Sequence, residues 1–96
     1  MFVWDETKRI SNLKKNGLDF RDAHLVYDNP NKITYDASRH NEYRLMDIAL
    51  LVLRGKLLTL VYMDIGEDVR VISFRNASRE ERKAYEQDRP GGHFGQ

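Results

Sequence analysis

The chain of 96 residues contains no cysteine, which excludes disulfides, a thiolate nucleophile and any cysteine-based metal site. Its three histidines are scattered without the spacing of metal ligands, and no glycine-rich phosphate loop is present. The longest apolar run, residues 48–53, is too short to span a bilayer, and no signal peptide is visible. We therefore expect a cytoplasmic protein with no metal, no cofactor and no membrane partner.

Charge is nearly balanced, with a formal net charge of +1, and this value alone does not indicate nucleic acid. Residues 69–96 carry six cations and four anions, a net of +2, and most of these cations are arginines. The planar guanidinium fork suits phosphate better than the point charge of a lysine. This segment is therefore the first place to look for a phosphate-binding surface, although solvated surface charge is the more common explanation of any single residue.

The first helix is predicted over residues 6–16. Asp5 is a suitable N-cap, and Gly17 suits the left-handed residue that follows a helix. Only Ile10 and Leu13 are strongly apolar, so we expect a narrow buried face built on these two side chains.

Two further helices are indicated by the capping residues at their N-termini. Asp19 is a suitable N-cap for a helix over residues 20–28, which Asn29-Pro30 would end. Ser78 and Glu81 form a capping box that begins a helix over residues 79–87.

Between these helices the periodicity changes to that of strands. The sequence predicts a short edge strand over 32–35 and longer strands over 42–53, 56–65 and 69–74. The short links between the long strands favour antiparallel neighbours, and strand 56–65 is apolar on both faces and therefore central. The expected fold is α+β, with two N-terminal helices, a three- to four-stranded antiparallel meander and a C-terminal helix. We expect one domain over residues 1–87 and a flexible tail over 88–96.

Alternation along the last strand separates its two arginines. One face would carry Arg70, Ile72 and Phe74, and the other Val71, Ser73 and Arg75. One interpretation is a phosphate-binding face, joined by Arg44, on which an arginine stabilises a phosphoryl transition state. The alternative is a solvated sheet face with ion pairs to Asp47, Asp64 or Asp68.

Two groups of residues near the ends of the chain occur in a fairly specific register. The opening group is Trp4-Asp5-x-x-Lys8, Asn12-x-x-Lys15-x-Gly17-Leu-x-Phe20 and Tyr27-Asp28-x-Pro30. The closing group is Val71-Ile72-Ser73-x-Arg75-x-Ala77-Ser78-x-x-Glu81-Arg82-x-x-Tyr85-Glu86. Together they resemble the BrnT family of bacterial toxins over about residues 2–87.

The resemblance implies a RelE-like fold and the toxin of a type II toxin–antitoxin system, a metal-independent ribonuclease that cleaves RNA, inhibits translation and stops growth. It also implies a BrnA-type antitoxin with a ribbon-helix-helix part, which neutralises the toxin and provides the pair's only contact with DNA. On this basis Arg70 and Arg75 would clamp the transition state. Tyr85 would stack on a base or bind phosphate, unless it is the apolar anchor of the last helix. RNA contacts are expected from Arg44, Lys8, Lys15 and Arg82, whereas the capping box fully explains Glu81.

The chain departs from the family at one position that bears on chemistry. Asn16 stands where the family commonly has a histidine, and an amide does not titrate near neutrality. This departure motivates a second hypothesis, an inactive relative that binds the antitoxin and regulates the operon. A third hypothesis is an unrelated α+β interaction domain.

Overall fold

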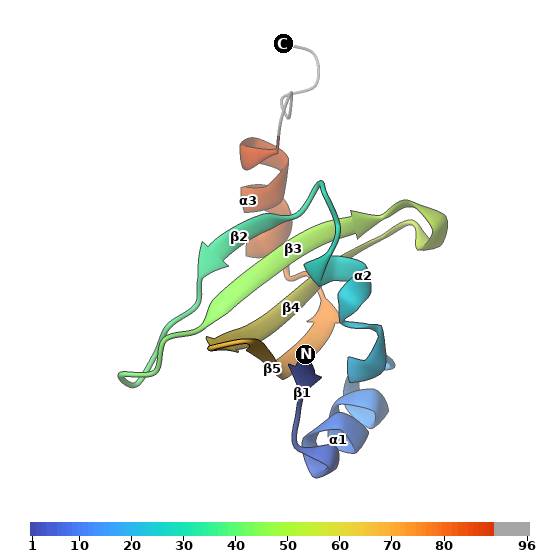
Figure 1. Cartoon of the computed structure of the whole chain (residues 1–96). Coiled ribbons are helices and arrows are strands. Elements are labelled where there is room, and N and C mark those ends of the chain that lie inside the picture. Colours follow the sequence, from blue (N-terminus) through green and yellow to red (C-terminus); the bar gives the residue numbers. More distant parts are fainter. Residues whose placement is uncertain (90–96) are drawn as a thin grey trace.

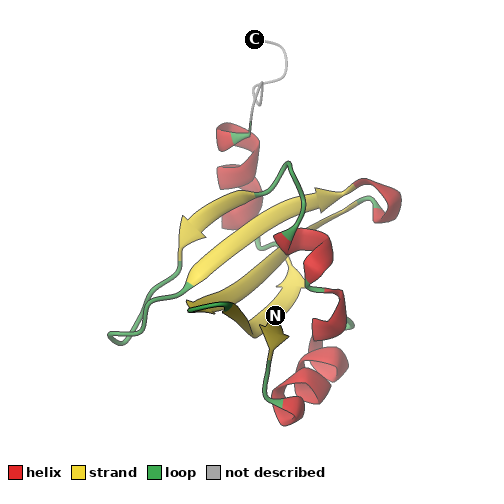
Figure 2. Ribbon diagram, in the orientation of Figure 1, coloured by secondary structure: helices red, strands yellow, loops and turns green. Residues whose placement is uncertain are grey.

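A five-stranded sheet in the order β1-β5-β4-β3-β2 is the centre of the computed structural model, which describes residues 1–89 (Figure 1). The strands are β1 (Phe2–Val3), β2 (Ile33–Asp36), β3 (Leu45–Leu51), β4 (Lys56–Ile65) and β5 (Asp68–Asn76). The helices are α1 (Glu6–Asn16), α2 (His24–Tyr27) and α3 (Arg79–Asp88), with 3-10 turns at Phe20–Asp22 and Val52–Arg54 (Figure 2). Within residues 1–89, no helix is long and apolar enough to cross a membrane.

The α+β class is confirmed, but the predicted count and pairing of the strands were wrong. The sheet has five strands and is mixed, because β1 runs parallel to β5 with Phe2 opposite Val69 and Val3 opposite Arg70. A strand of two residues directly before a helix has no periodicity that a sequence pattern could show. The other pairs are antiparallel, as predicted.

The predicted start of each helical segment agrees with the structure, whereas the predicted lengths agree less well. α1 has the predicted bounds, with Asp5 accepting from two backbone amides and Gly17 at φ +71°. The second predicted helix formed only in part: Phe20–Asp22 is a 3-10 turn capped by Asp19, and His24–Tyr27 is the single α-helical turn α2. α3 runs to Asp88, so the predicted tail begins inside the helix, and residues 90–96 lie outside the described part of the chain.

Strand β4 is central, as predicted, and both of its faces are buried. Leu58, Leu60 and Tyr62 belong to the larger core cluster, which also contains Val26 of α2. Leu57, on the other face, packs in a second cluster with Tyr85 of α3. α2 and α3 therefore cover opposite faces of the sheet (Figure 1).

A β-bulge at Ile72 changes which side chains share a face of β5. Val61 of β4 pairs with Ser73, and the next residue, Tyr62, pairs with Val71, so Ile72 is the extra residue. Arg70 and Arg75 pair with Met63 and Thr59, which are four residues apart on β4 and therefore point to the same face. The prediction that the two arginines lie on opposite faces was wrong, because strict alternation fails at a bulge.

Helix α1 packs against the sheet with polar side chains. Its buried residues are Arg9 and Asn12, whereas Ile10 and Leu13 are 43% and 39% exposed. The predicted buried face of α1 was therefore wrong. Polar contacts fix the orientation of this helix in place of an apolar stripe.

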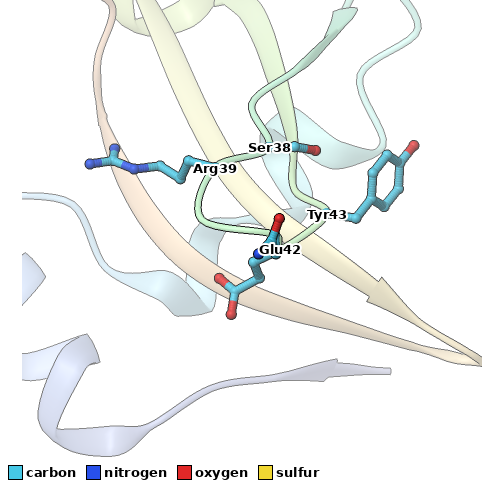
Figure 3. A pocket seen from close by; sticks show the side chains of 5 residues that line it. Ser38, Arg39, Glu42 and Tyr43 are labelled. Carbon is cyan, nitrogen blue, oxygen red and sulfur yellow. The ribbon is translucent and has the colours of Figure 1, made fainter.

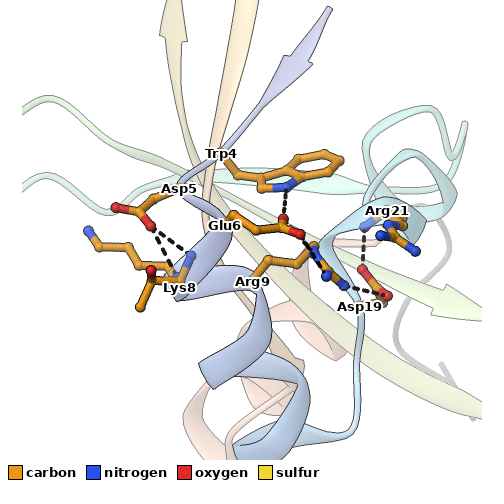
Figure 4. Close-up of polar contacts among 8 residues, drawn as sticks. Trp4, Asp5, Glu6, Lys8, Arg9, Asp19 and Arg21 are labelled. Atoms are coloured by element: carbon orange, nitrogen blue, oxygen red, sulfur yellow. Dashed lines mark hydrogen bonds and ion pairs between the residues drawn. The ribbon is translucent and has the colours of Figure 1, made fainter.

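Arg9 makes the first of these contacts, at the start of α1. Its Nε and Nη2 atoms donate to the two carboxylate oxygens of Glu6 at 2.7 and 2.8 Å, and Nη1 donates to Asp19 at 3.1 Å (Figure 4). Trp4 donates to the same Glu6 carboxylate, and these hydrogen bonds, Arg9 first, lower the pKa of Glu6 to about 2. The network ties α1 to the segment that follows it.

Asn12 makes the second contact, with the backbone of β5. Its Nδ2 donates to the carbonyls of Leu18 and Phe74 at 2.9 and 2.8 Å, and its Oδ1 accepts from the Phe74 amide at 3.2 Å. One side chain thus pairs both backbone groups of Phe74 that point away from β4. Because a buried amide without partners is costly, this contact fixes α1 beside β5.

Candidate functional site

The bulge brings the strongest candidate residues onto one surface, which we call the β5 face and define as Arg70, Ser73 and Arg75. Arg70 is exposed, and the Arg75 side chain is 34% exposed. Their partners on β4 are four residues apart, so the two arginines are separated by about 13 Å along the sheet. This surface presents two guanidinium groups to an extended ligand.

Arg75 is held by Glu81, the capping-box residue of α3. Nη1 and Nη2 of Arg75 donate to Oε1 and Oε2 of Glu81 at 2.7 and 2.9 Å, a bidentate pair. The Thr59 hydroxyl and the Ser78 amide donate to the same carboxylate at 2.9 and 2.8 Å. The capping box therefore does not account for all of Glu81, which also fixes the position of Arg75.

This network makes stability depend on pH. Burial of Glu81 disfavours its charge, but the hydrogen bonds from Arg75, Ser78 and Thr59 outweigh that penalty and lower its pKa from 4.5 to about 2. A group with a depressed folded-state pKa stabilises the fold above pH 4.5, and the contribution is lost as the pH falls towards 2. We expect a contribution on the order of 3 kcal/mol at neutral pH.

Denaturant unfolding at pH 7 and pH 3 measures this contribution. The wild type should lose more unfolding free energy between these two pH values than Glu81→Gln, whose amide does not titrate. Equal losses in both proteins would contradict the assigned pKa.

Helix α1 adds cations beside the β5 face. Lys8 and Lys15 line a depression of about 200 Å³ together with Asn16 and with Ser73 of the β5 face. Both lysines are exposed, and Asn16 is half-buried, with its Nδ2 donating to Asn12 at 2.9 Å. Asn16 therefore lies within the cationic surface.

The remaining candidate residues lie elsewhere. Tyr85 is 4% exposed, and its hydroxyl points at the Asn31 carbonyl at 3.4 Å, which favours the anchoring role over stacking. Arg44 is half-buried and paired with Glu42 just before β3. Arg82 is exposed on α3. The structure thus places Arg70, Arg75, Lys8 and Lys15 around Ser73, with Arg82 on the helix that carries Glu81.

The hairpin between β2 and β3 forms another shallow depression, lined by Ser38, Arg39, Asn41, Glu42 and Tyr43. Arg39 and Tyr43 point to opposite sides of this hairpin (Figure 3). Because these side chains do not converge, the hairpin is a weaker candidate than the β5 face.

The predicted ion pairs with strand carboxylates did not form as expected. Asp47 is fully buried and accepts from Lys32 at 2.7 Å, Thr34 at 2.6 Å and Tyr62 at 3.0 Å. Burial, and then the Asp47 charge, raise the pKa of Tyr62. Asp47 thus joins β2, β3 and β4 and takes no part in the β5 face.

Sequence reasoning missed the buried backbone contacts of Asn12 and the second role of Glu81. An asparagine in a helix interior is unfavourable by propensity, and this was the one available signal that Asn12 has a tertiary partner. No pattern in the sequence indicates the Arg75–Glu81 ion pair, because this contact depends on the bulge and on the angle between β5 and α3. Among residues 1–89, no group of three His, Cys, Asp or Glu side chains could hold a metal ion.

The fold and this surface define a small α+β protein with a cationic face suited to a phosphate backbone. The family model of BrnT, the ribonuclease toxin of type II toxin–antitoxin systems, matches residues 4–81, and the chain belongs to this family. The match includes Asn16, Arg70, Arg75 and Glu81 and ends before Tyr85. Membership of a type II system implies an antitoxin protein as partner. No curated protein matches the chain.

Proposed function

We propose that this chain is a metal-independent endoribonuclease that cleaves RNA on the β5 face, inhibits translation and thereby arrests growth. The observation that carries the proposal is the bulge at Ile72, which puts Arg70 and Arg75 on one face. Lys8 and Lys15 of α1 extend this positive surface. Its chemistry is that of phosphate binding, and the family is one of ribonuclease toxins.

In the proposed reaction the RNA supplies its own nucleophile. The 2′-hydroxyl attacks the adjacent phosphate and loses its proton, the bond to the 5′-oxygen breaks, and that oxygen gains a proton. The products are a 2′,3′-cyclic phosphate and a free 5′-hydroxyl. Charge accumulates on the phosphate oxygens in the transition state, where fixed guanidinium groups stabilise it.

Arg75 is the proposed transition-state clamp. Its bidentate bond to Glu81 fixes the guanidinium at the end of the strand, so little reorganisation is needed when the phosphate arrives. Since Arg70 lies about 13 Å along the sheet, we assign it to a more distant phosphate of the same RNA strand. Further backbone contacts are assigned to the exposed cations Lys8, Lys15 and Arg82, and to Arg44 if Glu42 releases it.

Proton transfer is the weakest part of this site. Glu81 has a pKa of about 2 and is a poor base at neutral pH. Asn16 occupies the position of the usual histidine and cannot titrate. The proposed catalysis therefore rests on positioning and charge stabilisation, and slow turnover is expected.

Asn16 also supports a second candidate function. A chain that binds RNA weakly and cleaves it poorly could act as an antitoxin-binding, operon-regulating module. In both cases we propose a BrnA-type antitoxin with a ribbon-helix-helix part, through which alone the pair contacts DNA.

Metal removal tests the proposal. Purified protein should cleave single-stranded RNA equally well with and without excess EDTA, because cations of the chain take the role of a metal. Loss of cleavage in EDTA would contradict the metal-independent route. RNA left intact under both conditions, with normal antitoxin binding, would favour the second function.

A further inference from the structure

The outward face of α1 combines apolar and cationic side chains without a partner among residues 1–89. Ile10 and Leu13 lie one helical turn apart and are 43% and 39% exposed. A shallow depression of about 480 Å³ runs along this face, lined by Thr7, Ile10, Ser11, Lys14 and Lys15. Isolated exposed aliphatic residues are common on protein surfaces, so exposure alone does not indicate a binding surface.

The exposure follows from the way in which α1 is attached. Arg9 and Asn12 hold a neighbouring side of the helix, about 100° around its axis, against the protein through ion pairs and backbone hydrogen bonds. Rotating α1 to bury Ile10 and Leu13 would break these contacts and leave buried polar groups unpaired. The fold therefore keeps the aliphatic side chains of α1 at the surface.

The charges around this face indicate what covers it. α1 carries four cations, Lys8, Arg9, Lys14 and Lys15, against one anion, Glu6. Glu6 is already engaged by Arg9 and Trp4, and no carboxylate lines the depression. A ligand for this face therefore needs apolar side chains for Ile10 and Leu13 and acidic groups for the lysines.

We infer that the outward face of α1 is the docking surface for an acidic amphipathic helix of the antitoxin. The identification of the partner as the antitoxin rests on the proposed toxin–antitoxin function. An RNA strand fits this face less well, because phosphates gain nothing from two aliphatic side chains. A helix bound here also lies next to Lys8 and Lys15 and hinders access of RNA to the β5 face, which couples binding to neutralisation.

The test measures binding of purified toxin to purified antitoxin, defined as the protein encoded beside this gene that binds the wild-type toxin. The double variant Ile10→Ser with Leu13→Ser should weaken binding at least about tenfold, as is usual for central apolar contacts. Lys14→Glu should also weaken it. The matched control, Val52→Ser with Leu53→Ser, removes two exposed aliphatic side chains at the β3–β4 turn and should bind as the wild type does.

RNA cleavage is measured on the same variants and should not change, and melting curves show that each variant is folded at the temperature of the assay. Wild-type binding by the Ile10/Leu13 variant, or equal weakening in the control, would overturn the inference. Reduced RNA cleavage by the Ile10/Leu13 variant with unchanged antitoxin binding would also overturn the inference and assign this face to RNA. Loss of self-association alone would overturn it too and assign the face to a second copy of the chain. Antitoxin binding through α1 by a wild type that leaves RNA intact would overturn the ribonuclease proposal and support this inference.

Discussion

Arg75→Ala is expected to reduce RNA cleavage by about 10²–10³-fold and to relieve growth arrest. The variant removes the guanidinium of the β5 face that a bidentate carboxylate holds in a fixed orientation. Cleavage of a labelled RNA by purified protein under single-turnover conditions measures the effect. Growth after induction without the antitoxin gives the corresponding readout in cells.

The same substitution removes two hydrogen bonds from the half-buried Glu81, so stability has to be followed in parallel. Arg75→Lys retains the charge without the fork and should lie between the wild type and the alanine variant. Arg79→Ala, an exposed arginine in the first turn of α3, is the matched control and should cleave normally. Wild-type cleavage by folded Arg75→Ala would remove Arg75 from the mechanism.

Asn16→His is expected to increase the rate of cleavage, by about 100-fold if the new imidazole takes part in proton transfer. Asn16 lines the depression that contains Lys8, Lys15 and Ser73, so a histidine there lies beside the proposed path of the RNA. The rate should also gain a pH dependence near the pKa of histidine, about 6.5, moved downwards by the neighbouring lysines.

Asn16→Gln, which cannot titrate, is the control for this gain. It should leave both the rate and its pH profile close to those of the wild type. An unchanged rate and an unchanged pH profile in a folded histidine variant would show that proton transfer at this position does not limit the reaction.

Local signals in the sequence predicted several elements well. Asp5 and Gly17 fixed the bounds of α1, and the Ser78–Glu81 capping box fixed the start of α3. These predictions succeeded because caps depend on residues only a few positions apart. The alternation along β4 likewise predicted a strand buried on both faces.

The features that build the candidate site were not accessible in this way. The residues around Ile72 suit a regular strand as well as a bulged one, so the sequence does not reveal the bulge. The bulge nevertheless places Arg75 on the same face of the sheet as Arg70. The orientation of α1 was mispredicted because long-range bonds of Asn12 outweigh the preference of Ile10 and Leu13 for burial. The sequence identified Arg70 and Arg75 as candidates by their charge. That they share one surface became clear only from the register of the sheet.

The chemistry of the RNA ends tests the central claim most directly. We predict that purified wild-type protein leaves a 2′,3′-cyclic phosphate and a 5′-hydroxyl at each cut, identified by the mass of the products. A single 2′-deoxy nucleotide on the 5′ side of a cut should abolish cleavage at that position and leave other positions unchanged. Cleavage of the deoxy-substituted RNA at the same rate, or products that carry a 5′-phosphate, would contradict the account.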